Sequence, residues 1–283
     1  MKFPLMIVLF SLIFQTSTQE RLALYQDEIP NAIRKDTAKY NANIPELFVY
    51  KPNDKKGNGF GVLIIPGGGY AHIAMDHEGH DVAKKLTQAG FTAFVLKYRL
   101  PSPNIMVDKS IGPIQDAQRA MQLIRSNFPS LSKVGVIGFS AGGHLASTLI
   151  TKSDHPFIAN PDHLSLAPDF AGLIYPVISM TDAVTHKGSK LNLLGENASL
   201  EKVNEFSAEK NVNKDVCPVF FVHAKDDKTV PIENSYLMMR ALDQVHVKNK
   251  LLTYEEGGHG FGLFNKTSSV AWLDSFIDWT NRL

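Results

Sequence analysis

One serine lies in a sharp-turn pattern at the point where an apolar stretch ends. Residues 138–142 read GFSAG, directly after the β-rich residues 133–137, and Ser140 is at their centre. Glycine on both sides lets a backbone pass from a strand into a helix without a side-chain clash, and it leaves the serine hydroxyl at the tip of the turn. The pattern predicts a nucleophile at Ser140, although an ordinary strand-to-helix turn has the same appearance.

A serine hydroxyl is a poor nucleophile at neutral pH and needs a base and an orienting acid. An imidazole can accept its proton, and a carboxylate on the other ring nitrogen fixes the tautomer and stabilises the imidazolium. Two later loops offer these groups, namely GGHGFG at 257–262, with His259, and HAKDDKTVP at 223–231, with Asp226 and Asp227. The candidate triad is Ser140, His259 and Asp227, with Asp226 as a rival by adjacency.

A third loop could bind an oxyanion. Residues 66–70 read PGGGY after the apolar residues 61–65, and three glycines allow backbone N–H groups to approach a ligand closely. The N–H of Gly68 or Gly69, together with that of Ala141, would receive the charge of a tetrahedral intermediate. Each such donor contributes about 3 to 4 kcal/mol to catalysis.

These loops need a scaffold that brings them together, and the chain predicts one. Solidly apolar β-rich runs alternate with amphipathic stretches, which is typical of a mostly parallel sheet with helices on both faces. Ligands bind beyond the carboxyl ends of the strands in such sheets, where all of these loops begin. The predicted strands are 47–50, 61–65, 91–98, 133–137, 170–174, 219–223 and 250–255, and the predicted helices are 79–89, 114–127, 141–151, 231–245 and 270–281.

Residues 179–216 interrupt this alternation. They are polar, rich in Asn and Lys and only weakly periodic, so we expect an insertion or a small cap across the top of the sheet. A solvated loop is the alternative. The chain of 283 residues is otherwise the right length for a single large α/β domain.

The N-terminus predicts export. One lysine precedes an apolar run at 3–14, which is too short to span a bilayer comfortably, and small polar residues follow it. We interpret residues 1–18 as a signal peptide and residues 19–283 as a secreted or periplasmic catalytic domain without a stable membrane span, an uncleaved anchor being the lesser alternative. The 29 basic and 28 acidic residues give a net charge of +1, which does not indicate a nucleic-acid partner.

The chain resembles the α/β-hydrolase serine esterases, and within them the carbohydrate acetylesterase and feruloyl-acetylesterase-like (BD-FAE-like) group. The order serine, acid, histidine along the chain is the one that this fold requires. The resemblance runs from about residue 60 to the C-terminus, and it implies that Asp227, not Asp226, is the triad acid. It is carried by PGGGY at 66–70, DHEG at 76–79, LKYRLP at 96–101, GFSAGGHLA at 138–146, YPVISM at 175–180, HAKDDKTVP at 223–231 and GGHGFG at 257–262.

What the resemblance implies is an α/β-hydrolase fold and a carboxylic ester hydrolase that needs no metal or organic cofactor. It suggests short acyl groups, acetyl first, on carbohydrate such as acetylated xylan or its oligosaccharides. Two alternatives stay open: a serine peptidase of the prolyl-oligopeptidase type, although the chain is too short for the large propeller domain of such enzymes, and a non-enzymatic binding protein that kept the fold.

Several other polar residues have both a functional and a structural interpretation. Tyr70 could line an acyl pocket or cover the glycine loop. The DHEGH run at 76–80 lacks the histidine spacing of a zinc helix, and we expect Asp76 to cap the helix that follows it. We expect His144 to be a packed core histidine and Asp116 to pair with Arg119 three residues later on a helix.

Overall fold

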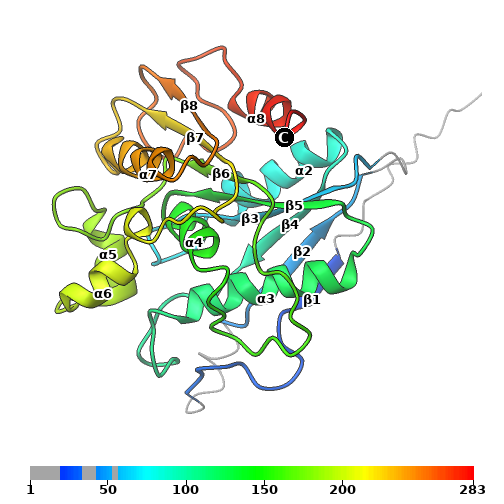
Figure 1. Ribbon diagram of the computed structural model, residues 1–283, viewed down its shortest axis with the longest axis vertical. Helices are drawn as coiled ribbons and strands as arrows, with labels where there is room; N and C mark the ends of the chain where they lie inside the picture. The colour runs from blue at the N-terminus through cyan, green and yellow to red at the C-terminus, as the bar shows by residue number, and fades with distance from the viewer. Residues whose placement is uncertain (1–19, 34–42, 53–56) are drawn as a thin grey trace, which may run out of the picture.

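The computed structural model of the protein describes residues 20–33, 43–52 and 57–283 (Figure 1). The predicted signal peptide at 1–18 lies outside the described residues. No helix in the described part of the chain combines the length and the apolar character that crossing a bilayer requires.

An eight-stranded sheet forms the centre of the fold, in the order β1-β2-β4-β3-β5-β6-β7-β8. The pairs β1/β2 and β2/β4 are antiparallel and every other neighbouring pair is parallel. The inner strands are apolar on both faces because both faces are covered. The strands are β1 (Glu20–Ala23), β2 (Glu46–Tyr50), β3 (Phe60–Ile65), β4 (Thr92–Lys97), β5 (Lys133–Phe139), β6 (Ala171–Ile174), β7 (Val219–Ala224) and β8 (Asn249–Tyr254).

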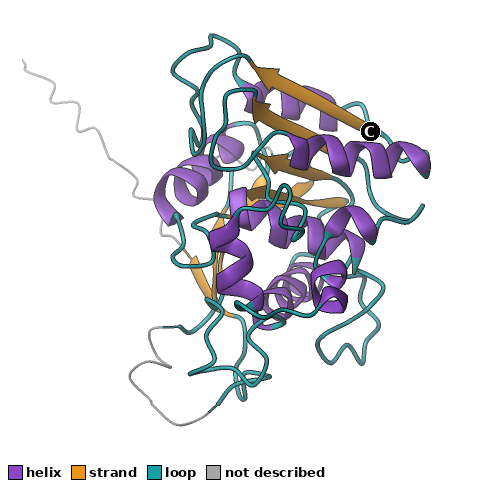
Figure 2. Ribbon diagram, turned by 90° about the vertical axis from the view of Figure 1, so that its left-hand side faces the viewer, coloured by secondary structure: helices purple, strands orange, loops and turns teal. Residues whose placement is uncertain are grey.

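Helices cover the sheet on two sides (Figures 1 and 2), and each side has its own apolar cluster. Helices α3, α4 and α7 bury their apolar residues in one cluster, while α2 and α8 bury theirs in the other. The helices are η1 (Met75–His80), α2 (Asp81–Gln88), α3 (Gly112–Asn127), α4 (Ser140–Thr151), α5 (Lys187–Leu194), α6 (Leu200–Glu205), η2 (Ala208–Lys210), α7 (Glu233–Gln244) and α8 (Trp272–Thr280).

The topology brings the carboxyl ends of four parallel strands to one edge of the sheet. The glycine loop follows β3, Ser140 follows β5, Asp227 follows β7 and His259 follows β8. The predicted α/β-hydrolase fold is confirmed, and each predicted strand and helix is present with ends that differ by a few residues.

Three features differ from the sequence-based expectation. β1 pairs with β2 although its four residues carry no strong strand pattern. Residues 179–216 contain α5, α6 and η2, which form short helices with little apolar periodicity; Figure 1 shows α5 and α6 together at one end of the molecule. The helix expected from residue 79 begins at Met75 as a π-helical turn, and no side chain caps it, so the expected cap by Asp76 is wrong.

The expected ion pair between Asp116 and Arg119 is also wrong. Asp116 is fully buried and binds the guanidinium of Arg99 at 2.8 Å, while Arg119 donates to the carbonyl of Leu24. Helical spacing predicted that Asp116 pairs with the cation one turn away. A buried carboxylate instead favours a cation that can donate to both of its oxygens. Arg99 does so with its side chain and its backbone N–H, and Tyr25 donates a further hydrogen bond.

Candidate active site

Ser140 lies at the tip of a tight turn between β5 and α4. Its φ of 51° is in the left-handed region, which a non-glycine residue adopts only at a local cost. A Cβ on Gly138 would lie 2.4 Å from the carbonyl oxygen of Gly142, and one on Gly142 would lie 2.1 Å from that of Ile65. Both glycines are therefore required by close backbone approach, as the sequence predicted.

The three predicted triad side chains form a hydrogen-bonded chain. The hydroxyl of Ser140 lies 2.8 Å from Nε2 of His259, and Nδ1 of His259 lies 2.7 Å from Oδ2 of Asp227. Asp226, the rival acid, accepts a hydrogen bond from the backbone N–H of Gly258 at 2.8 Å instead. The geometry thus favours Asp227 as the partner of the imidazole, and Asp226 holds the backbone beside it.

The carboxylate of Asp227 is held by several donors. Its Oδ1 accepts the N–H groups of Thr229 and Val230, both at 2.9 Å, and Nε2 of His223 lies 3.4 Å from its Oδ2. Burial alone would raise the pKa of Asp227, but hydrogen bonds from His223 and His259 hold it well below its usual value. Asp227 therefore stays ionised and keeps a proton on Nδ1 of His259.

The glycine loop lies against the serine turn. Gly68 has a φ of 121° and Gly69 a φ of 63°, both in the region that favours glycine. A Cβ on Gly68 would lie 2.3 Å from the carbonyl oxygen of His72. Ala141, whose N–H is the other predicted oxyanion donor, is in the first turn of α4, where backbone N–H groups are free of helical partners.

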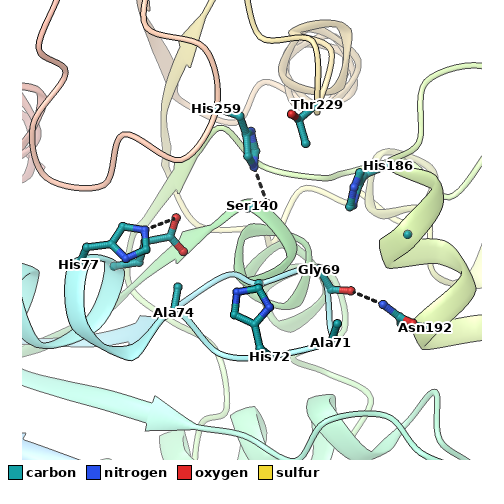
Figure 3. Close-up of a pocket in the computed structure, with 13 residues that line it drawn as sticks. Gly69, Ala71, His72, Ala74, His77, Ser140, His186, Asn192, Thr229 and His259 are labelled. Atoms are coloured by element: carbon teal, nitrogen blue, oxygen red, sulfur yellow. Dashed lines mark hydrogen bonds and ion pairs between the residues drawn. The ribbon is translucent and has the colours of Figure 1, made fainter.

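A pocket of about 370 Å³ opens above Ser140 (Figure 3). One wall comes from the glycine loop and η1, and the opposite wall comes from α5 and the residue before it. The side chain of Asn192 in α5 donates to the carbonyl of Gly69 at 2.8 Å, so α5 is tied to the glycine loop. The lining residues are Gly68, Gly69, Ala71, His72, Ala74, His77, Glu78, Ser140, His186, Gly188, Asn192, Thr229 and His259.

Tyr70 does not line this pocket, so the candidate role in substrate binding is not supported and the alternative, that it covers the glycine loop, is. Its side chain is only 2% exposed, and its hydroxyl lies 2.8 Å from Nδ1 of His144. Nε2 of His144 donates a hydrogen bond to the carbonyl of Phe206, so the unprotonated Nδ1 accepts a hydrogen bond from the hydroxyl of Tyr70. The φ of 59° at Tyr70 turns its ring into the core beneath the loop, which the sequence did not reveal. His144 is the packed core histidine that we expected.

The burial of His144 predicts a loss of stability in mild acid. Burial lowers its pKa from 6.5 to about 4, so below pH 6.5 the unfolded chain binds a proton that the folded chain does not. The stabilisation is complete above pH 6.5 and falls by roughly 3 kcal/mol on acidification to pH 4. Urea unfolding should show that the free energy of unfolding falls less between pH 7 and pH 4.5 for His144→Gln than for the wild type. His155→Gln, at an exposed histidine, is the control, and an equal loss in all three proteins would contradict the assignment.

Several pocket residues were not given a role by the sequence-based analysis, and Glu78, His186 and Asn192 are the ones with the most specific contacts. Glu78 lies in the DHEG motif, and its place in that motif was the one available signal. His186 and Asn192 lie in the weakly periodic segment 179–216, where no pattern marks them. His186 is half-buried, its Nδ1 accepts the N–H of Ser189, and burial together with His259 lowers its pKa. Its side chain is therefore neutral and can offer its Nε2 proton to a ligand.

Comparisons with known proteins agree with this architecture. Two curated relatives are an endo-1,4-beta-xylanase B from Butyrivibrio fibrisolvens, 34% identical over 81% of this chain, and an acetylxylan esterase from Xylanibacter ruminicola, 32% identical over 77%. The matches cover 36% and 44% of those proteins, so this chain spans less than half of their length.

Solved structures extend the comparison. The acetyl ester-xyloside bifunctional hydrolase from Caldicellulosiruptor lactoaceticus is 34% identical, with a TM-score of 0.77 over 93% of this chain and 94% of that one. Esterase Est2 from Thermogutta terrifontis, with propionate bound, shares the fold at 22% identity and a TM-score of 0.68 over 90% and 94% of the two chains. The BD-FAE family profile matches residues 47–242. The chain therefore belongs to the BD-FAE family and has the α/β-hydrolase fold.

Proposed function

We propose that this chain is an exported serine esterase that releases short acyl groups, acetyl first, from xylan or its oligosaccharides. The observation that carries the proposal is the hydrogen-bonded chain from Ser140 through His259 to Asp227 at the floor of a pocket. The names of the relatives, an acetylxylan esterase and an acetyl ester-xyloside hydrolase, support the substrate class. The pocket volume of about 370 Å³ is at the lower end of the range for small-molecule sites and supports a small ester.

The proposed reaction has two steps. Ser140 Oγ attacks the ester carbonyl carbon while His259 Nε2 takes the hydroxyl proton, and the carbonyl oxygen becomes an oxyanion at the N–H groups of Ala141 and Gly68 or Gly69. The carbon–oxygen bond to the sugar then breaks, and the sugar oxygen takes the proton from His259. Water attacks the acyl-enzyme in the same way, which releases acetate and restores Ser140.

Product analysis tests this function. The purified protein should release acetate from acetylated xylo-oligosaccharides and from an aryl acetate, and the Ser140→Ala variant should release none above background. Cleavage of peptides without ester hydrolysis would favour a serine peptidase instead. Binding of xylan fragments without any turnover would favour a non-enzymatic binding protein. N-terminal sequencing of the secreted product tests export, with cleavage near residue 18 as the expected result.

A further inference from the structure

The carboxylate of Glu78 joins two loops of the site. Glu78 is in η1, its side chain is 4% exposed, and it forms part of the pocket wall. Its Oε2 accepts the backbone N–H of Gly67 at 2.7 Å, and its Oε1 accepts the hydroxyl of Tyr175 at 2.7 Å. A buried carboxylate is costly unless it is well paired, and each of its two oxygens accepts a hydrogen bond from one fixed donor. The exposed imidazole of His77 also lies near it, with Nε2 3.7 Å from Oε1.

The first donor belongs to the glycine loop. Gly67 is directly before Gly68 and Gly69, the candidate oxyanion donors. A Cβ on Gly67 would lie 2.8 Å from Oε2 of Glu78 and 2.9 Å from Cβ of Ser140. Gly67 is thus packed closely between the Glu78 carboxylate and the serine, and its hydrogen bond to Glu78 fixes the glycine loop beside Ser140.

The second donor belongs to the segment that supports the histidine. Tyr175 follows β6 with a φ of 36°, and its ring packs edge-on against that of His259 with the centroids 4.8 Å apart. Its hydroxyl also accepts the backbone N–H of Gly262 at 2.9 Å. Burial, and the nearby Glu78 carboxylate, raise the pKa of Tyr175 well above its usual value. The hydroxyl therefore stays protonated and donates a hydrogen bond to Glu78.

We propose that Glu78 is a positioning residue that fixes the glycine loop and the His259 loop relative to Ser140. This inference rests on the proposed function and deepens it. Glu78 is not proposed as a general acid or base, because both of its oxygens accept hydrogen bonds from groups that the fold holds in place. Its role is to fix the oxyanion donors and the imidazole at a constant separation. It does so through three consecutive hydrogen bonds, which join Gly67 to Glu78, Glu78 to Tyr175 and Tyr175 to Gly262.

Kinetics of three variants test the proposal on an aryl acetate. Glu78→Ala removes both hydrogen bonds and should lower kcat about 100-fold, the effect expected of a misplacement near 1 Å, with a much smaller change in KM. Glu78→Gln keeps an acceptor for Gly67 and should restore most of the rate. Tyr175→Phe keeps the ring against His259 but removes the hydroxyl. Combined with Glu78→Ala, it should add little further loss, because the two residues act through one connection.

Active-site titration with a fluorophosphonate probe separates positioning from unfolding. Every variant should retain a full equivalent of reactive serine but react more slowly, and Asp76→Ala, at an exposed carboxylate of the same helix, should match the wild type. A wild-type rate in Glu78→Ala, or a rate loss explained wholly by fewer active molecules, would overturn the inference alone. If Glu78→Ala does not fold, Tyr175→Phe decides, because it removes the hydroxyl that links Glu78 to Gly262: a lowered kcat supports the inference and a wild-type kcat overturns it. A wild-type chain that neither hydrolyses the ester nor reacts with the probe would overturn the proposed function and this inference with it.

Discussion

Replacement of Ser140 with Ala should lower kcat for ester hydrolysis roughly a million-fold, leaving only the rate that binding and the oxyanion donors support. The hydroxyl lies 2.8 Å from Nε2 of His259, so it is the group that the imidazole can deprotonate. Alanine has the same Cβ as serine, so the left-handed φ of 51° costs the variant no more than the wild type. The measurement is initial-rate kinetics on an aryl acetate, with thermal unfolding to establish that the variant is folded.

The same helix provides a control for this variant. Ser147 is fully buried in α4, and its hydroxyl donates to the carbonyl of His144, away from the pocket. Ser147→Ala should keep a kcat near that of the wild type. Comparable activity in Ser140→Ala and the wild type would show that the nucleophile is another group.

Replacement of Asp227 with Asn should lower kcat about 10,000-fold through the tautomer of His259. The N–H groups of Thr229 and Val230 both point at Oδ1 of Asp227 and will hold the amide oxygen of Asn there. The amide NH₂ then takes the place of Oδ2, 2.7 Å from Nδ1 of His259, and donates to it. The imidazole proton moves to Nε2, where the ring can no longer accept the proton of Ser140.

The neighbouring carboxylate provides the matched control. Asp226 accepts a hydrogen bond from the backbone N–H of Gly258, and the amide oxygen of Asn can do the same. Asp226→Asn should therefore retain most of the activity. If Asp226→Asn loses more kcat than Asp227→Asn, Asp227 is not the triad acid. The pH dependence of kcat/KM gives a further check. The lowered pKa of Asp227 keeps the wild-type carboxylate ionised well into the acid range, so protonation of Asp227 should not limit kcat/KM in mild acid.

The sequence was informative about the residues that the backbone alone positions. Ser140, Asp227 and His259 each follow a strand of the parallel part of the sheet. Parallel strands place their carboxyl ends at one edge, so strand order was enough to bring the three together. Gly138 and Gly142 were predictable for a similar reason, since their role depends on a missing side chain and not on a distant partner.

The sequence was less informative where a side chain chooses among distant partners. Asp116 binds Arg99 and not Arg119, and Tyr70 points to His144 and not to the pocket. Each outcome depends on which buried group lies opposite after packing, and spacing along a helix or loop does not contain that information. The helices of residues 179–216 were missed because their sides are too evenly polar to produce a 3.6-residue period.

Helix α5 contributes a wall of the pocket, whereas the triad comes from loops at the ends of the sheet. Under the proposed function, selectivity and bond cleavage thus depend largely on separate stretches of the chain. Substitutions within residues 186–194, in evolution or in a laboratory library, can therefore make room for a bulkier acyl or sugar group. The distances between Ser140, His259 and Asp227 need not change. Such a library should keep Asn192, since it holds Gly69, and the buried Ser189 and Leu193, which pack α5 onto the fold.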